Sequence, residues 1–283
     1  MVEWCWLNGQ VMPLSEAKVS VEDRGFLFAD GVYEALRVYN GTPFLLQQHL
    51  DRLERSLSGI EMPLPVEKSL LASEILKLVK RSGWSDALIY LQITRGPGER
   101  NHVFPKHPKP TTLFYVRQLA LLPAIDQSKP YALHSVADER WNKCWIKSIA
   151  LLANTLARNA ADKAGADEAV FVENSIVREG ASTNLFAVIG GRLVTHPLGP
   201  KILRGVTRDL LLSILRDLGV AVVERPMTLD EAQHADEVFL SSSVREVMWV
   251  SRWDGLQTGE RSCGPVTRRL HEEYRKRVRA ATG

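Results

Sequence analysis

Hydrophobic residues recur at every third or fourth position in two early stretches of the chain, residues 46–60 and 68–82. This spacing places the apolar side chains on one face of an amphipathic helix. Gly59 and Gly83 stand at the ends of these stretches, and glycine can end a helix because it accepts a left-handed conformation. The same reasoning predicts three further helices, over 149–164, 206–218 and 265–281.

Runs of β-branched and aromatic residues predict strands between these helices. Residues 34–39 lead directly into Asn40-Gly41, a pair that favours a type I′ hairpin turn because both residues tolerate positive φ. A second hairpin is predicted across Gly190-Gly191. The predicted strands are 34–39, 87–95, 112–117, 131–137, 168–172, 184–189, 192–195, 220–225 and 237–241.

The segment 118–130 has no sustained period and predicts a linker between two domains, residues 1–120 and 121–283. Thr228 and Glu231 have the spacing of a capping box, which predicts the start of a short helix. Strands and helices do not alternate regularly, and this disfavours a doubly wound parallel sheet. We therefore predict a mixed α/β (α+β) fold in two lobes.

Composition and charge argue against several classes of protein. Of 283 residues, 45% are hydrophobic and 24% are charged, which is typical of a globular chain. A net charge of +3 is too small to indicate a nucleic-acid-binding protein. No apolar run approaches the roughly 18 residues of a membrane span, and the first residues do not form a basic signal peptide. Cys5, Cys144 and Cys263 are odd in number and far apart, which favours the reducing cytoplasm.

Lys147 and Glu179 could take part in catalysis. Lys147 is surrounded by apolar residues, and a desolvated lysine amine can form a Schiff base, although this feature alone favours a lysine at a helix start that only snorkels to solvent. Glu179 follows in a connection between strands and could hold a ring nitrogen protonated, or simply occupy a solvated turn. The seven histidines show no metal-ligand spacing, so we expect no metal site.

An anion site is predicted where Leu203-Arg-Gly205-Val206-Thr207 opens a helix. Glycine permits close approach, and the free amides with the threonine hydroxyl suit a phosphate. The hydroxyls of Ser242 and Ser243 and the guanidinium of Arg52 could bind the same anion, although serine and threonine at helix starts are often only caps.

A second anion site is predicted in the loop that follows Arg95, where Arg100 and His102 stand two positions apart. Such a pair can bind a carboxylate, and the alternative is an exposed basic loop. The glycines of this loop lack the Gly-Lys-Ser/Thr of a nucleotide-binding P-loop.

Together these motifs resemble the fold-type IV pyridoxal-phosphate enzymes, and within them the D-amino-acid aminotransferases. The resemblance runs from Trp6 to about Trp249. Its most specific stretches are Glu22-Asp-Arg-Gly-Phe-Leu-Phe-Ala-Asp-Gly-Val-Tyr-Glu34, Thr94-Arg-Gly with Arg100-x-His102-x-Phe-Pro105, Ile146-Lys147-Ser148, Glu179-Gly-x-Ser-x-Asn184 and Leu203-x-Gly-x-Thr-Arg208.

The resemblance implies a role for each matched residue. Lys147 is expected to carry pyridoxal 5′-phosphate as a Schiff base and to move a proton, with Glu179 at the pyridine nitrogen and Ser182 close by. Leu203 and Gly205 would lie against the cofactor. The phosphate would be held by Arg52, Val206, Thr207, Ser242 and Ser243, and the substrate by Tyr33, Arg100 and His102.

The resemblance also implies an assembly and a fold. In this family the Arg-x-His loop reaches into the neighbouring subunit's site, so a homodimer is expected. The expected architecture is a smaller α/β N-terminal lobe and a larger β-barrel-like C-terminal lobe with the cofactor lysine, the cofactor lying in the cleft between them. Ser243, Val244, Arg245 and Trp249 depart from the family pattern beside the cofactor, and they bear on the preference for the substrate side chain.

The leading hypothesis is therefore a transaminase that moves an amino group from a D-amino acid, such as D-alanine, to a 2-oxo acid. Branched-chain L-amino-acid aminotransferases and aminodeoxychorismate lyases share the fold and most of these motifs. Arg100 and His102 distinguish the leading hypothesis, because neither alternative relies on that carboxylate site. A basic interaction protein without a cofactor is the alternative from another class.

Overall fold

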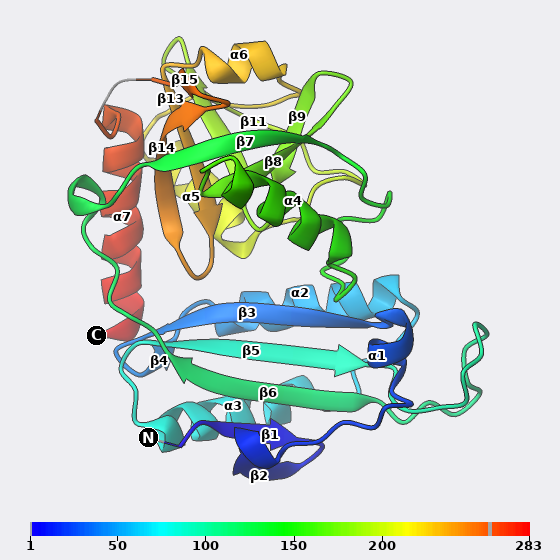
Figure 1. Cartoon of the computed structure of the whole chain (residues 1–283). Helices are drawn as coiled ribbons and strands as arrows, with labels where there is room; N and C mark the ends of the chain where they lie inside the picture. The colour runs from blue at the N-terminus through cyan, green and yellow to red at the C-terminus, as the bar shows by residue number, and fades with distance from the viewer. Residues whose placement is uncertain (1, 260–261) are drawn as a thin grey trace. The chain divides into compact units, whose positions relative to one another are not determined.

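The computed structural model describes residues 2–259 and 262–283. Contacts between Cα atoms divide the chain into two compact units (Figure 1). Unit 1 contains the chain up to Leu121 together with Ile146–Ala150 and Ala280–Gly283, and unit 2 contains Leu122–Trp145 and Leu151–Arg279. The first division lies next to the predicted domain boundary. Residues 146–150 and 280–283, which the prediction places in the second domain, are grouped with unit 1, and the backbone of 147–149 pairs with a strand of that unit.

Unit 1 is built on a six-stranded sheet in which every neighbouring pair is antiparallel. Its order is β2(Gln10–Pro13), β1(Trp4–Leu7), β6(Thr111–Gln118), β5(Ala87–Thr94), β3(Gly31–Tyr39) and β4(Thr42–Pro43). The predicted hairpin is confirmed, because Asn40 and Gly41 both have positive φ, at 46° and 74°. The short helix α1(Arg24–Phe28) precedes β3, and η1(Leu14–Glu16) follows β2.

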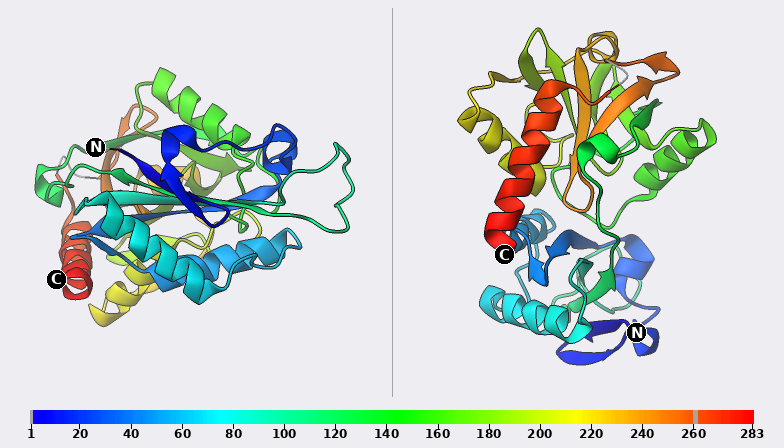
Figure 2. Two further views of the ribbon diagram at one scale, coloured as in Figure 1. Left: turned by 90° about the horizontal axis from the view of Figure 1, so that it is seen from below. Right: turned by 90° about the vertical axis from the view of Figure 1, so that its left-hand side faces the viewer.

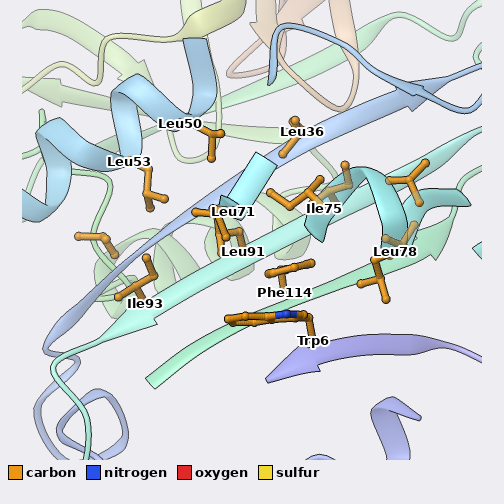
Figure 3. Close-up of a cluster of buried hydrophobic side chains, with 14 of the residues drawn as sticks. Trp6, Leu36, Leu50, Leu53, Leu71, Ile75, Leu78, Leu91, Ile93 and Phe114 are labelled. Carbon is orange, nitrogen blue, oxygen red and sulfur yellow. The ribbon is translucent and has the colours of Figure 1, made fainter. Parts of the chain in front are cut away.

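Two helices, α2(Leu46–Gly59) and α3(Lys68–Ser82), cover one face of this sheet (Figure 2). Their predicted apolar faces are confirmed, since they pack into one buried cluster with alternate residues of β5 (Figure 3). Trp6 and Phe114 stack within it, with ring centroids 5.1 Å apart. The labelled members of the cluster are Trp6, Leu36, Leu50, Leu53, Leu71, Ile75, Leu78, Leu91, Ile93 and Phe114.

The C-terminal ends of α2 and α3 differ from one another. Gly83 ends α3 with φ +70°, as predicted. The prediction for Gly59 is wrong, because Gly59 is the last helical residue of α2 and the left-handed residue is Glu61, with φ +57°. The N–H groups of Ile60 and Met62 bond back to the carbonyl oxygen of Leu57, so the chain completes its turn before it leaves the helix.

Unit 2 contains a curled, mostly antiparallel sheet, in agreement with the predicted barrel-like lobe (Figure 1). The order is β12(Val222–Glu224), β11(Arg192–Thr195), β10(Asn184–Ile189), β13(Glu237–Ser242), β14(Glu246–Trp253), β7(Tyr131–Ala137), β8(Glu168–Glu173) and β9(Ile176–Gly180), with β15(Leu256–Gln257) paired to β14. Parallel pairs join β11 to β12, β14 to β7 and β7 to β8.

The helices of unit 2 are α4(Leu152–Lys163), α5(Val206–Asp217), α6(Leu229–Gln233) and most of α7(Pro265–Thr282), with η2(Ile125–Gln127) inside the predicted linker. The predicted helix start is confirmed at α6, because Thr228 Oγ1 accepts from the N–H of Glu231 at 3.1 Å, whereas the Glu231 carboxylate, the other half of a capping box, pairs with Arg225. Sequence reasoning missed α1, β1, β2, β9, β14 and β15. Within the described residues, none of the helices has the length and apolar character needed to cross a membrane.

Candidate active site

The segment that carries Lys147 lies along the outer edge of β3 in unit 1. Tyr33 N–H donates to the carbonyl oxygen of Lys147 at 3.0 Å, and Ile149 N–H donates to that of Gly31 at 3.1 Å. These bonds bring the half-buried Lys147 side chain to Tyr33, with Nζ 4.2 Å from the ring centroid. An ammonium group is attracted to an aromatic face at this distance. Tyr33 and Lys147, separated by more than a hundred residues, are therefore neighbours.

Arg52 belongs to a buried charged group that sequence reasoning did not identify. Its Nε donates to Glu34 Oε1 and its Nη2 to Glu34 Oε2, each at 2.7 Å. His49 Nδ1 lies 2.7 Å from Glu34 Oε2, and all three side chains are almost fully buried. A bidentate pair of this kind holds the guanidinium in one orientation.

Burial by itself would raise the pKa of Glu34, but the charges of Arg52 and His49 outweigh it and hold that pKa well below its usual range. Burial lowers the pKa of His49, while the charge of Glu34 opposes this shift. A signal for the group does exist in the sequence. Glu34 interrupts an apolar strand, and His49 and Arg52 are three residues apart, on one face of a helix.

Arg100 and His102 lie on the loop between β5 and β6, and both are exposed. The ring of Phe28, the last residue of α1, contacts both side chains. Its centroid is 5.4 Å from Arg100 Cζ and 5.3 Å from the centroid of the His102 ring. The structure therefore brings the two residues that are predicted to bind a carboxylate against the same aromatic ring.

Glu179 lies in strand β9 of unit 2, which corrects the prediction that it stands in a connection between strands. It is buried, and its Oε1 accepts from Arg140 Nη1 at 2.7 Å. Oε2 accepts from Asn184 Nδ2 at 3.0 Å, and the N–H of Leu203 is 3.1 Å away. The strand was missed because Arg178 and Glu179 break its apolar pattern. Arg140, the strongest partner of Glu179, lies 39 residues away and was also missed.

The electrostatics of Glu179 suit proton exchange near neutral pH. Burial raises the pKa of Glu179 to about 7, although Arg140 and the N–H of Leu203 act in the opposite direction. A buried carboxyl group with such a pKa can share a proton with a weakly basic nitrogen.

The N-terminus of α5 presents the predicted anion donors. Gly205 is the N-cap residue, followed by Val206 and Thr207 in the first turn. Thr207 Oγ1 and Ser243 Oγ are 3.4 Å apart, so two of the predicted hydroxyls meet here. Ser242 Oγ instead accepts from the N–H of Arg245 at 3.1 Å.

Asn184 joins this helix start to Glu179. Its Nδ2 donates to the carbonyl oxygen of Leu203 at 2.9 Å as well as to Glu179. A Cβ atom at Gly205 would lie 2.0 Å from Asn184 Oδ1, so only glycine allows this approach. The Asn184 side chain therefore connects Glu179 with the start of α5, because it bonds Glu179 and Leu203 and lies against Gly205.

Ser182 lies apart from these bonds. Its Oγ donates to Oε2 of the buried Glu168 at 2.6 Å, and burial raises the pKa of Glu168. Among the departures from the family pattern, Trp249 is a buried residue of β14 whose Nε1 donates to the carbonyl oxygen of Ser128, and Arg245 is exposed. In the part of the chain that the structure describes, no group of His, Cys, Asp or Glu side chains could hold a metal ion.

Comparison with known proteins gives consistent results. The family model for amino-transferase class IV matches residues 31–253. D-alanine aminotransferases from Staphylococcus haemolyticus and Bacillus licheniformis are 38% and 34% identical to this chain, over 96% and 97% of it and over 97% of each relative.

Solved structures of branched-chain amino acid aminotransferases are also similar. The enzyme from Escherichia coli superposes with a TM-score of 0.91 and 25% identity, covering 100% of this chain and 97% of the other. The enzyme from Thermobaculum terrenum, solved in its PLP form, gives a TM-score of 0.88 and 25% identity, covering 99% of this chain and 95% of the other.

Proposed function

This chain belongs to the class IV aminotransferases, which use pyridoxal 5′-phosphate, and on that premise we propose that it transfers the amino group of a D-amino acid to a 2-oxo acid. D-alanine and 2-oxoglutarate are the pair we expect it to use. Identity of 34–38% to D-alanine aminotransferases over nearly the whole chain supports this specificity. The observation that carries it is the pair Arg100 and His102 against one ring, because a guanidinium fork matches a carboxylate.

The hydrogen-bonding groups in unit 2 fit a phosphorylated pyridine. Glu179 is an acceptor for a ring nitrogen, and the start of α5 offers amides and hydroxyls for a phosphate. Asn184 connects these two groups, because it donates both to Glu179 and to the carbonyl oxygen of Leu203. Ser241 Oγ, buried on the strand residue directly opposite Asn184, has no hydrogen-bond partner among the described residues. A buried unpaired hydroxyl favours a further polar group beside it.

Pyridoxal phosphate, when bound, supplies a carbonyl group that condenses with amines and a ring that accepts the electrons of a Cα–H bond. We assign its covalent attachment to Lys147 Nζ, which also moves the proton at Cα. Tyr33 would orient that amine through its ring, which Nζ contacts at 4.2 Å, and would also bind the substrate carboxylate. Glu179 would keep a proton at the ring nitrogen, because an ionised carboxylate beside that nitrogen favours its protonated form.

The remaining assignments follow from the family resemblance. Arg52, Val206, Thr207, Ser242 and Ser243 would bind the phosphate. Leu203 and Gly205 would lie against the cofactor, with Ser182 nearby, and Arg100 and His102 would bind the substrate carboxylate. We also propose a cytoplasmic homodimer in which the Arg100–His102 loop reaches the neighbouring subunit's site.

A branched-chain L-amino-acid aminotransferase is the second candidate, because solved structures of such enzymes superpose with TM-scores near 0.9. The two candidates differ in where the substrate carboxylate is bound. Exchanging the places of carboxylate and side chain presents the Cα–H of the opposite enantiomer to the same lysine. A carboxylate held by Arg100 and His102 therefore favours D-amino acids.

The experiment measures kcat/KM for D-alanine, L-alanine and L-leucine with 2-oxoglutarate as acceptor, in the wild type and in Arg100→Ala. We expect D-alanine to be the best substrate. Arg100→Ala should raise KM for D-alanine and for the 2-oxo acid, and leave the cofactor absorbance intact. A preference for either L-amino acid, or unaltered kinetics in Arg100→Ala, would move the assignment to the second candidate.

A further inference from the structure

Two buried arginines share one carboxylate at the base of the loop between β5 and β6. Arg24 Nε and Arg95 Nε each lie 2.8 Å from Asp30 Oδ2, and both arginines are less than 5% exposed. One carboxylate neutralises only one guanidinium, so the second depends on other acceptors. Backbone carbonyl oxygens are these acceptors. Arg95 Nη2 donates to the carbonyl oxygen of Ile60 at 2.6 Å, and Arg24 Nη1 donates to that of Asn101 at 2.5 Å.

The bond to Asn101 falls at a critical position. Asn101 is the one residue between Arg100 and His102, so Arg24 fixes the peptide that joins them. Phe28 comes from the same short helix, α1, which lies beside the start of this loop (Figure 1). Its ring contacts the Arg24 guanidinium at 4.8 Å as well as both loop side chains. Two side chains of helix α1 therefore hold the loop: Arg24 bonds the loop backbone, and Phe28 contacts the loop side chains.

We propose that Arg24 and Phe28 are positioning residues for binding of the substrate carboxylate. Arg24 holds the Asn101 peptide, and Phe28 holds the guanidinium of Arg100 and the ring of His102 at a fixed separation. A long exposed side chain loses rotamer freedom when it binds a ligand, and ordering it beforehand reduces that cost. This inference rests on the proposed function, because it assumes that Arg100 and His102 bind the carboxylate.

The test uses the holoenzyme with Arg24→Lys and Phe28→Leu. Lysine keeps the charge beside Asp30 but cannot reach Asp30 and Asn101 together, and leucine keeps an apolar side chain without the aromatic face. We expect KM for D-alanine to rise about tenfold in Arg24→Lys and about threefold in Phe28→Leu, with kcat changed less than about twofold. The inhibition constant of propionate, an unreactive carboxylate, should rise in parallel. Reaction with ethylamine, which has no carboxylate, should not change.

Asp86→Asn is the matched control. Asp86 forms a part-buried ion pair with Arg37 in the same unit, 3.2 Å between Oδ1 and Nη2, and it directly precedes β5, whereas the loop follows the other end of that strand. This control should lower stability and leave KM and the propionate constant unchanged. A rise in either constant for Asp86→Asn would mean that general destabilisation explains the effects, and the proposal would be wrong.

A double-variant comparison separates this inference from the proposed function. In an Arg100→Ala/His102→Ala background, Arg24→Lys and Phe28→Leu should have no further effect on propionate inhibition. Persisting effects in that background, or no effect of either substitution in the wild type, would overturn the positioning role while the carboxylate site stands. If the background itself left propionate inhibition unchanged, the carboxylate assignment of the proposed function would fail first.

Discussion

Replacing Arg52 with alanine tests whether this residue binds phosphate or only balances Glu34. Arg52 makes two 2.7 Å hydrogen bonds to Glu34, which is 0% exposed. Alanine removes both donors and leaves the carboxylate buried beside His49. Removing one partner of a buried ion pair costs about 3–5 kcal/mol, because the other charge stays uncompensated. We expect the free energy of unfolding of the cofactor-free protein to fall by roughly that amount.

The second variant, Arg52→Ala with Glu34→Gln, removes the uncompensated charge. Urea unfolding should then show that much of the lost stability returns. The affinity for pyridoxal phosphate, measured by spectroscopic titration, should stay weaker in both variants by about 1.5–3 kcal/mol, the contribution of a hydrogen bond to a charged group. Stability and cofactor affinity therefore respond differently if Arg52 has both roles.

The pH dependence of stability provides an independent check. The pKa of Glu34 is lowered in the folded protein, so this carboxylate stabilises the fold above its ordinary pKa, near 4.3, and that contribution is lost as the pH falls below it. The acid-side loss of stability should be smaller in Glu34→Gln. If cofactor affinity returned together with stability in the double variant, Arg52 would serve Glu34 alone and the phosphate assignment would be wrong.

Two further predictions concern the chemistry. Borohydride reduction of the holoenzyme followed by peptide mapping should place the pyridoxyl group on Lys147, and a label on any other lysine would contradict the assignment. Glu179→Gln keeps the shape of the side chain but removes the charge that favours a protonated ring nitrogen, so the half-reaction with D-alanine should slow by orders of magnitude while the cofactor stays bound. Half-reaction rates equal to those of the wild type would remove Glu179 from this role.

Some features of this protein follow from the sequence alone because their causes are local. Helix α3 spans Lys68–Ser82, as predicted, since its apolar spacing and Gly83 act within a few residues. The turn at Asn40-Gly41 depends on the conformational freedom of those two residues. Lys147 and Glu179 were also singled out from the sequence, from their residue types and their place in short motifs.

Other features were decided only by tertiary structure, because they depend on residues far apart in the chain. Glu34 meets Arg52 across 18 positions, Glu179 meets Arg140 across 39, and Arg24 reaches Asn101 across 77. Strand β9 carries Glu179 despite its charged residues, because the fold supplies a buried partner for that carboxylate. Periodicity reports which face of an element is apolar, whereas the partner of a buried charge is set by the packing of separate elements.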